Sequence, residues 1–237
     1  NSESRNITVT NNIVNWSNDT AFDFEEVDSQ FQNFSTWSYS IINNTIISSG
    51  GSAIFCINTH DGKISENHIL NATGCGGIGT IVIGTDTKVP PGNKASDVLV
   101  NNNIIENAYV GISIYGQNNT RSMTNVIVKN NTITNCQWTG IAIGGWTTYI
   151  TLEENKITST SLAEADRYDG INNSGGGYCT ISRNTIIDPQ HMMRSGFYEK
   201  WYDYNTITGN TFIGVDNPIT IASGRTNNII ENNIIIQ

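Results

Sequence analysis

Residues 126–134 read Val126-Ile127-Val128-Lys129-Asn130-Asn131-Thr132-Ile133-Thr134, and the pattern around Asn131 recurs along the whole chain. An apolar residue stands three positions before this Asn, and another stands two positions after it. Nine residues share this environment: Asn12, Asn44, Asn67, Asn103, Asn131, Asn155, Asn184, Asn210 and Asn233. Their spacing varies between 23 and 36 residues while the apolar offsets stay fixed. A repeat of this length with variable spacers is typical of a solenoid whose insertions lie on loops.

Each repeat is predicted to consist of short strands. β-branched residues crowd the segment around each Asn, which favours extended backbone. A second apolar segment follows, often opened by Gly and strictly alternating, as in Gly140-Ile141-Ala142-Ile143. No run with a helical period separates the strands, so a β-α-β arrangement is excluded. The sequence therefore predicts an all-β fold in which each coil stacks in parallel on the one before.

The recurring Asn is predicted to point inward at a bend of each coil. Stacked strands lie about 4.8 Å apart, so equivalent residues form columns along the axis. In such a column each carboxamide donates to one neighbouring coil and accepts from the other. Asn also tolerates the left-handed backbone angles of a sharp corner. The alternative, that these Asn are ordinary surface turn residues, leaves their fixed apolar flanks unexplained.

These units and their Asn ladder resemble the right-handed parallel β-helix family of secreted carbohydrate-active proteins, a pectate-lyase-like family with PbH1-type repeats. The resemblance covers essentially all 237 residues, and the nine units predict about nine coils in one domain, 1–237, which we expect to be a portion of a longer protein. It is specific for the fold and leaves the reaction open, because the family includes lyases, polygalacturonases, mannuronan epimerases, phage tailspikes and non-catalytic envelope proteins. The Asn- and Ile-rich repeat is also similar to disaggregatase-related domains of archaeal envelopes, which act on a chondroitin-like matrix.

The composition narrows the classes of partner. Acidic residues outnumber basic ones, 21 to 12, which excludes a general nucleic-acid binder. No apolar stretch approaches the length needed to span a bilayer. The abundance of Asn, Ser, Thr, Tyr and Trp offers hydroxyl, amide and aromatic groups that suit sugars. We therefore expect a secreted or cell-envelope protein whose partner is a polysaccharide.

The two ends of the predicted solenoid lack a recognisable cap. The first strand is expected to begin by Ile7 and the last to run to Ile236, without a polar cap at either end. Since an open end exposes the core of a solenoid, we expect additional coils or another domain to cover the ends.

The four cysteines show no metal-binding spacing, although a requirement for Ca²⁺ stays possible. Cys56 and Cys179 fall in strands and are expected to be buried free thiols, as opposed to a Cys56–Cys75 bridge.

Function is expected where insertions interrupt the repeat, because the repeated columns build the scaffold. Three insertions stand out: residues 24–37, residues 84–97, and a third that spans two successive coils at 161–169, 188–194 and 198–203. The third holds the densest mixture of acids, bases and aromatics. Asp169 precedes a Gly-Ile strand, and Arg194 lies at nearly the same offset one coil later, so the two are predicted to be neighbours on one wall. The adjoining loops carry Asp166, Arg167, Tyr168 and His191.

Two reaction classes fit these residues. In a hydrolase, Asp166 and Asp169 would act as acid and base. In a lyase or epimerase, His191 or Tyr198 would take the proton beside a uronate carboxylate, and Arg167 or Arg194 would hold that carboxylate. The predicted substrate-binding residues are Arg167, Tyr168, Tyr198, Lys200, Trp201 and Trp146. The alternative is an exposed ion-pair network without a catalytic role.

Family motifs do not decide between these reactions. The acidic and Gly-His-Gly motifs of polygalacturonases and the Arg-x-Pro-x-x-Arg motif of pectate lyases are absent. Asp188-Pro189-Gln190-His191 is similar to the Asp-Pro-His of mannuronan C5-epimerases, but an inserted Gln displaces the His. Trp146 and Tyr149 come after the second strand of their coil, as His60 and Tyr115 do in other coils. These side chains would line an opposite face of the rod or cover the edges of its core.

The leading hypothesis is an extracellular polysaccharide-degrading enzyme, a lyase or a glycoside hydrolase, that binds a linear acidic or amino-sugar polymer. Its rival is a non-catalytic envelope, adhesin or tailspike-like module. We expect Asp169→Asn and Arg194→Ala to abolish activity while leaving the unfolding transition almost unchanged.

Overall fold

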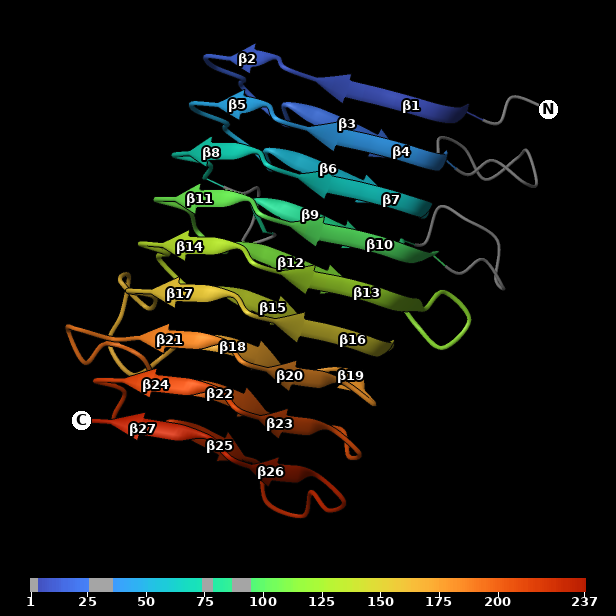
Figure 1. The fold of residues 1–237 in the computed structure, drawn as a ribbon. Coiled ribbons are helices and arrows are strands. Elements are labelled where there is room, and N and C mark those ends of the chain that lie inside the picture. The colour runs from blue at the N-terminus through green and yellow to red at the C-terminus, as the bar shows by residue number, and fades with distance from the viewer. Residues whose placement is uncertain (1–3, 26–35, 74–78, 87–94) are drawn as a thin grey trace.

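The computed structural model describes residues 4–25, 36–73, 79–86 and 95–237, and every regular element in these ranges is a β-strand. The strands form three parallel sheets that run side by side along one rod (Figure 1). This confirms the all-β parallel solenoid predicted from the repeat.

Each coil passes through the three sheets in the same order. The first sheet contains β1 (Ser4–Thr10), β4 (Thr36–Ile42), β7 (Thr59–Ser65), β10 (Ala95–Asn101), β13 (Met123–Lys129), β16 (Thr147–Glu153), β20 (Thr180–Ser182), β23 (Thr206–Thr208) and β26 (Ile229–Glu231), with β19 (Gly176–Gly177) beside β16. The second contains β2 (Ile13–Val14), β5 (Thr45–Ile46), β8 (His68–Leu70), β11 (Ile104–Glu106), β14 (Thr132–Thr134), β17 (Lys156–Thr158), β21 (Thr185–Ile187), β24 (Thr211–Ile213) and β27 (Ile234–Ile236). The third contains β3 (Phe22–Glu25), β6 (Ile54–Ile57), β9 (Ile81–Gly84), β12 (Ile112–Tyr115), β15 (Ile141–Ile143), β18 (Asp169–Asn173), β22 (Ser195–Glu199) and β25 (Ile219–Ile221).

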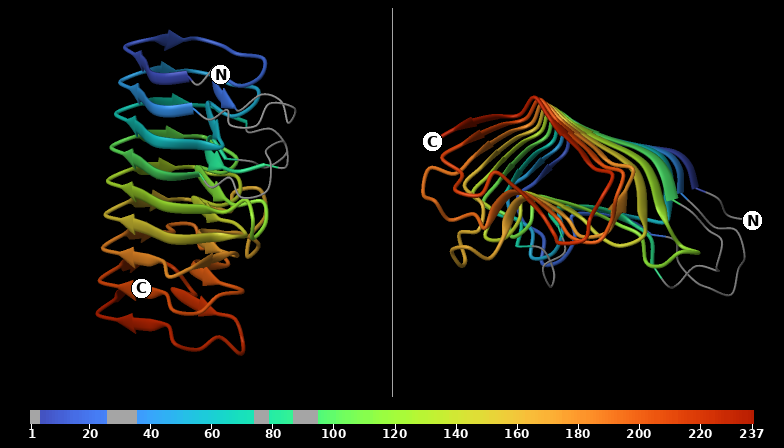
Figure 2. Two further views of the ribbon diagram at one scale, coloured as in Figure 1. Left: turned by 90° about the vertical axis from the view of Figure 1, so that its right-hand side faces the viewer. Right: turned by 90° about the horizontal axis from the view of Figure 1, so that it is seen from below.

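The number of complete turns is smaller than the number of Asn units. In the described ranges the third sheet has eight strands, and the last coil contributes only β26 and β27. The predicted count of about nine coils is therefore too high for complete three-sheet turns. Seen along the axis, the coils superimpose on one another (Figure 2), which places equivalent residues in columns.

The Asn ladder is present along the whole rod. At each of its eight steps the side-chain amide of one Asn donates to the carbonyl oxygen of the next, over 2.9–3.0 Å. From Asn44 to Asn210 the ladder residues are at most 1% exposed. The apolar residues before and after them pack against the same core, so the interpretation as surface turns is wrong.

The left-handed backbone angle falls one residue earlier than predicted. The residues that directly precede the ladder have φ between 53° and 65°: Asn11, Asn43, Glu66, Asn102, Asn130, Glu154, Arg183, Gly209 and Asn232. No ladder Asn has a positive φ. The bend is therefore made by an outward residue, and the ladder Asn is left free to bond along the axis.

The cysteines that the structure describes are free, and the last coil leaves inward apolar residues exposed. Cys56 and Cys179 are buried free thiols, as predicted, and so is Cys136, whereas Cys75 lies outside the described residues. In the last coil, Ile230 and Ile235 occupy inward columns and are 46% and 55% exposed. The prediction that further coils or another domain cover the ends stays a prediction.

One inward column of the third sheet changes from apolar to polar. Cys56, Ile83, Ile114 and Ile143 precede Asn173 and Glu199 in this column. The Glu199 carboxylate is fully buried and accepts hydrogen bonds from Asn173 Nδ2 at 2.6 Å, Asn205 Nδ2 at 3.0 Å and the backbone N–H of Tyr202 at 3.1 Å. Burial raises the pKa of Glu199 to about 7, against the effect of these donors.

Glu199 is expected to make stability depend on pH. Its pKa is raised from 4.5 to about 7 in the folded chain, so folding binds a proton between these values and stability falls as pH rises through them. The loss should be on the order of 2 kcal/mol between about pH 5 and about pH 8. Urea denaturation at the two pH values should show this loss in the parent chain and in an exposed control, Glu231→Gln. A Glu199→Gln variant that loses as much stability over this range would contradict the assignment.

Candidate functional site

The third sheet carries the predicted charged pair at the start of two neighbouring strands. Asp169 opens β18 and lies opposite Ser195 of β22, so Arg194 stands one residue before its level. The backbones of the two coils approach each other closely at Gly170, where an added Cβ would lie 2.7 Å from the carbonyl oxygen of Gly196. Glycine is needed there for the coils to stack.

Asp169 and Arg194 form a two-point ion pair. Arg194 Nε donates to Asp169 Oδ1 at 3.0 Å, and Arg194 Nη2 donates to Asp169 Oδ2 at 2.6 Å. The side chain of Asp169 is 1% exposed and that of Arg194 is 39% exposed. This confirms that the two residues are neighbours on one wall.

Two outward residues of the sheet complete the cluster. Asn172 Nδ2 donates to Asp169 Oδ2 at 2.7 Å. Tyr198 lies opposite Asn172 in the next coil, and the guanidinium of Arg194 stands 4.1 Å from the centre of its ring. Arg194 is thus held between a buried carboxylate and an aromatic ring, with part of its surface open to solvent.

Burial and hydrogen bonding both shift the pKa values of the Asp169–Arg194 pair. Burial raises the pKa of Asp169, and hydrogen bonds from Arg194 and Asn172 oppose that shift. The hydrogen bonds that Arg194 donates to Asp169 raise the pKa of Arg194, so the guanidinium stays charged. Asp169 therefore depends on Arg194 for its compensation in the low-dielectric interior.

The loop before β22 fixes the backbone of Arg194. Asp188 is fully buried, and its Oδ2 accepts from the N–H of Met193 at 2.7 Å. The N–H of Arg194 donates to the carbonyl of Tyr168 at 2.8 Å, which ties this loop to the loop of the preceding coil.

An aromatic stack borders the same edge of the third sheet. The rings of Trp138 and Tyr168 are nearly parallel at 5.3 Å, and Tyr109 meets Trp138 edge-on at 5.5 Å. The guanidinium of Arg167 lies 5.3 Å from the centre of the Tyr168 ring and also pairs with Glu164. Three successive coils thus contribute one ring each to this border.

The other predicted catalytic residues are exposed and have different partners. Asp166 has a φ of 58°, and its N–H donates to the carbonyl of Met192 at 2.9 Å. His191 Nδ1 lies 2.9 Å from Asp216 Oδ1, with both side chains about 60% exposed. Unlike Asp169, neither Asp166 nor His191 is buried in the wall.

The remaining predicted binding residues lie beyond the C-terminal ends of the third-sheet strands, whereas Asp169 and Arg194 lie at the N-terminal ends. Lys200 and Trp201 follow β22, with the ammonium 4.9 Å from the centre of the indole ring, and Trp146 lies between β15 and β16. Trp201 and Trp146 are 58% and 45% exposed. Most of the insertions at 24–37 and 84–97 lies outside the described residues.

No group of three or more His, Cys, Asp or Glu side chains is placed to hold a metal ion within the described ranges. A requirement for Ca²⁺ therefore stays a prediction. In the same parts of the chain, no helix has the length and apolar character to cross a membrane.

Sequence reasoning missed Asn172, Asp188 and the rings of Tyr109 and Trp138. Asn172 could have been found, because strict alternation from Ile171 places it on the outer face beside Tyr198. The aromatic stack gave no comparable signal, since Tyr109, Trp138 and Tyr168 stand on loops of different length.

Solved structures with the same fold have diverse functions. The Azotobacter vinelandii mannuronan C-5 epimerase AlgE6 A-module matches with a TM-score of 0.70 and 12% identity over 99% of this chain and 59% of that one. The Streptococcus pneumoniae surface adhesin PfbA matches with a TM-score of 0.59 and 11% identity, over 100% of this chain and 72% of that one. The exopolygalacturonase of Thermotoga maritima matches with a TM-score of 0.51 and 12% identity, over 86% of this chain and 55% of that one. At such identities the likeness shows the fold alone.

The family, in contrast, is shown by the sequence. No curated protein sequence matches the chain significantly. The family described as "Right handed beta helix region" matches residues 2–157 and 120–237, which together span nearly the whole chain. The chain therefore belongs to the right-handed β-helix family.

Proposed function

We propose that the chain is an extracellular or surface polysaccharide-degrading enzyme that binds a linear acidic polymer along the outer face of the third sheet. The observation that carries this proposal is the placement of Arg194, which Asp169 holds above the ring of Tyr198 with 39% of its side chain exposed. A rod with a long face and bordering loops suits an extended chain of sugars.

The geometry favours a lyase over a hydrolase. Nε and Nη2 of Arg194 bind Asp169, which leaves Nη1 to hold a uronate carboxylate. The hydroxyl of Tyr198, once deprotonated, would take the proton on the carbon beside that carboxylate. The bond to the glycosidic oxygen on the next ring carbon then breaks, the leaving oxygen takes up the proton that the Tyr198 hydroxyl has gained, and a carbon–carbon double bond forms. Asp169 positions the cation and does not touch the substrate.

A hydrolase would need Asp169 as one of two working carboxyl groups. Both of its oxygens accept hydrogen bonds from Arg194, and Oδ2 also accepts from Asn172. This arrangement occupies Asp169, so we place the hydrolase second.

Cationic side chains lie near the site in spite of the net charge of −9, although Arg194 is paired with Asp169 and Arg167 with Glu164. Arg194, Arg167 and Lys200 lie on the strands and loops around the third sheet. Arg183 stands apart, because it pairs with Glu153 and Glu154 at the corner of the Asn ladder.

A non-catalytic module is the alternative. The partly exposed aromatic border of Tyr109, Trp138 and Tyr168 would bind a glycan without chemistry, and the adhesin PfbA has the same fold. The two proposals differ in whether polymer is consumed.

Activity on uronic-acid polymers tests the proposal. We expect ultraviolet absorbance of an unsaturated product from at least one of polygalacturonate, alginate and chondroitin. Tyr198→Phe should lower kcat by about a hundredfold or more, because the base is lost. Arg194→Lys keeps the charge but loses the fork, so it should lower kcat/KM with an unchanged product. Tyr178→Phe, on the first sheet, is the matched control.

Reducing ends without absorbance would indicate the hydrolase. Binding without any product would indicate the module. Full activity in Tyr198→Phe would remove Tyr198 from the reaction.

A further inference from the structure

A second surface with an unusual backbone lies on the first sheet, away from the proposed active site. One column at the bend of this sheet has positive φ in every coil: Asn6, Ser38, Asp61, Asp97, Asn125, Tyr149, Tyr178, Tyr204 and Asn227. Small polar residues tolerate this conformation, whereas tyrosine rarely adopts it. Three successive tyrosines at such positions point to a function for their rings.

The three tyrosines form an exposed stack. The ring centres of Tyr149 and Tyr178 are 5.5 Å apart, and those of Tyr178 and Tyr204 are 5.4 Å apart. Their exposed fractions are 58%, 52% and 55%. Mutual stacking accounts for the two inner contacts, but the face of Tyr149 turned away from Tyr178 has no ring partner in the stack.

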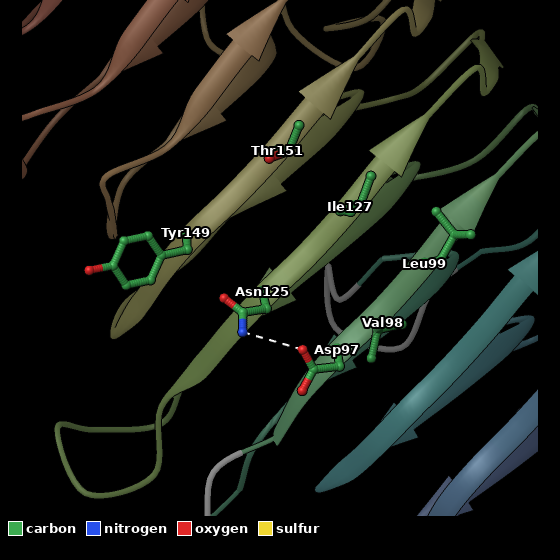
Figure 3. A pocket seen from close by; sticks show the side chains of 7 residues that line it. All are labelled: Asp97, Val98, Leu99, Asn125, Ile127, Tyr149 and Thr151. Atoms are coloured by element: carbon green, nitrogen blue, oxygen red, sulfur yellow. Dashed lines mark hydrogen bonds between the residues drawn. The ribbon is translucent and has the colours of Figure 1, made fainter.

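That open face borders a hollow of about 500 Å³. Its other lining residues include Asp97, Asn125, Leu99, Ile127 and Thr151 from three successive strands (Figure 3). Ile127 is 42% exposed at its centre. The volume falls in the usual range of small-molecule sites, about 300–1,000 Å³.

The lining combines a ring face, an apolar floor and two polar side chains. Asp97 accepts from Ser96 Oγ at 2.6 Å and from Asn125 Nδ2 at 3.3 Å, and a carboxylate retains capacity for further donors. Asp97 is the one charged residue among the described residues that line the hollow. A negatively charged sugar is therefore disfavoured, and a neutral one is favoured.

We propose that this hollow binds a pyranose residue of a neutral glycan. The apolar face of the sugar stacks on the open face of Tyr149, and its hydroxyls donate to Asp97 and accept from Asn125. The site lies on the first sheet and the proposed active site on the third, so it does not rest on the proposed activity. It would hold the protein on a matrix that the third sheet does not act on.

Calorimetric titration with neutral oligosaccharides tests this site. The probes are oligosaccharides of glucose, mannose, galactose, xylose and N-acetylglucosamine, with oligogalacturonate as the charged comparison. At least one neutral probe should bind. Tyr149→Asn should weaken that binding about tenfold, since it removes the ring and keeps a residue that the column already uses at Asn125. Thr151→Arg should block the hollow.

Two controls separate this site from other effects. Tyr204→Asn makes the same change at the far end of the stack and should leave affinity within about twofold. Arg194→Lys, on the third sheet, should also leave it unchanged.

The proposal is overturned if no neutral probe binds, if Tyr149→Asn binds as well as the parent chain, or if only the oligogalacturonate binds at Tyr149. None of these outcomes bears on turnover at the third sheet, which is measured separately.

Discussion

Replacing Asn131 with alanine is expected to lower the free energy of unfolding by about 4 kcal/mol, because it leaves several buried groups without partners. The Asn131 amide donates to the carbonyls of Val100 and Lys129, both at 3.0 Å, and to Asn155 Oδ1 at 2.9 Å. Its oxygen accepts from the backbone and side-chain N–H groups of Asn103, at 2.9 Å and 3.0 Å. Bulk solvent does not reach these partners at a position that is 1% exposed.

Chemical denaturation monitored by circular dichroism measures this effect, and hydrogen exchange of β11, β14 and β17 shows whether the loss stays local, as expected in a solenoid. Asn130→Ala is the matched control. Asn130 is exposed and has a φ of 54°, so its replacement should cost only about 1 kcal/mol, for the left-handed backbone. Equal losses in the two variants would mean that the ladder does not stabilise the rod.

The second large effect is expected for Arg194→Ala, which should lower the free energy of unfolding by about 3 kcal/mol. It removes the cation from an Asp169 side chain that is 1% exposed. The partial exposure of Arg194 places the estimate at the low end for a broken buried pair. The sequence predicts an almost unchanged unfolding transition for this variant, and the burial of Asp169 makes a loss of stability the expected result instead.

A double-mutant cycle measures this coupling. Adding Asp169→Asn to Arg194→Ala should recover part of the lost stability, since no buried charge then remains. An exposed pair, Arg167→Ala with Glu164→Gln, is the control and should change stability by less than about 1 kcal/mol. Additive losses at Asp169 and Arg194 would show that the pair is not coupled.

Much of the scaffold could be predicted from the chain, because the repeat constrains it nine times over. The inward position of the Asn and the parallel stacking follow from equal offsets in successive coils, and the proximity of Asp169 and Arg194 follows from offsets that differ by one residue. Tyr198 was also placed in the right region. Its contact with Arg194 was not predicted, since a side-chain contact depends on rotamers and on packing between coils.

The amino-acid sequence by itself determined the coil, the ladder and the columns, because hydrogen-bonding and apolar groups recur at fixed distances along the chain. Only the tertiary structure decided which members of a column are buried, stacked or ion-paired. It placed Glu199 in the core, compensated Asp169 with Arg194, and left one face of Tyr149 open. These outcomes depend on the residues one coil above and below, 23 to 36 positions away, and local sequence does not encode that environment.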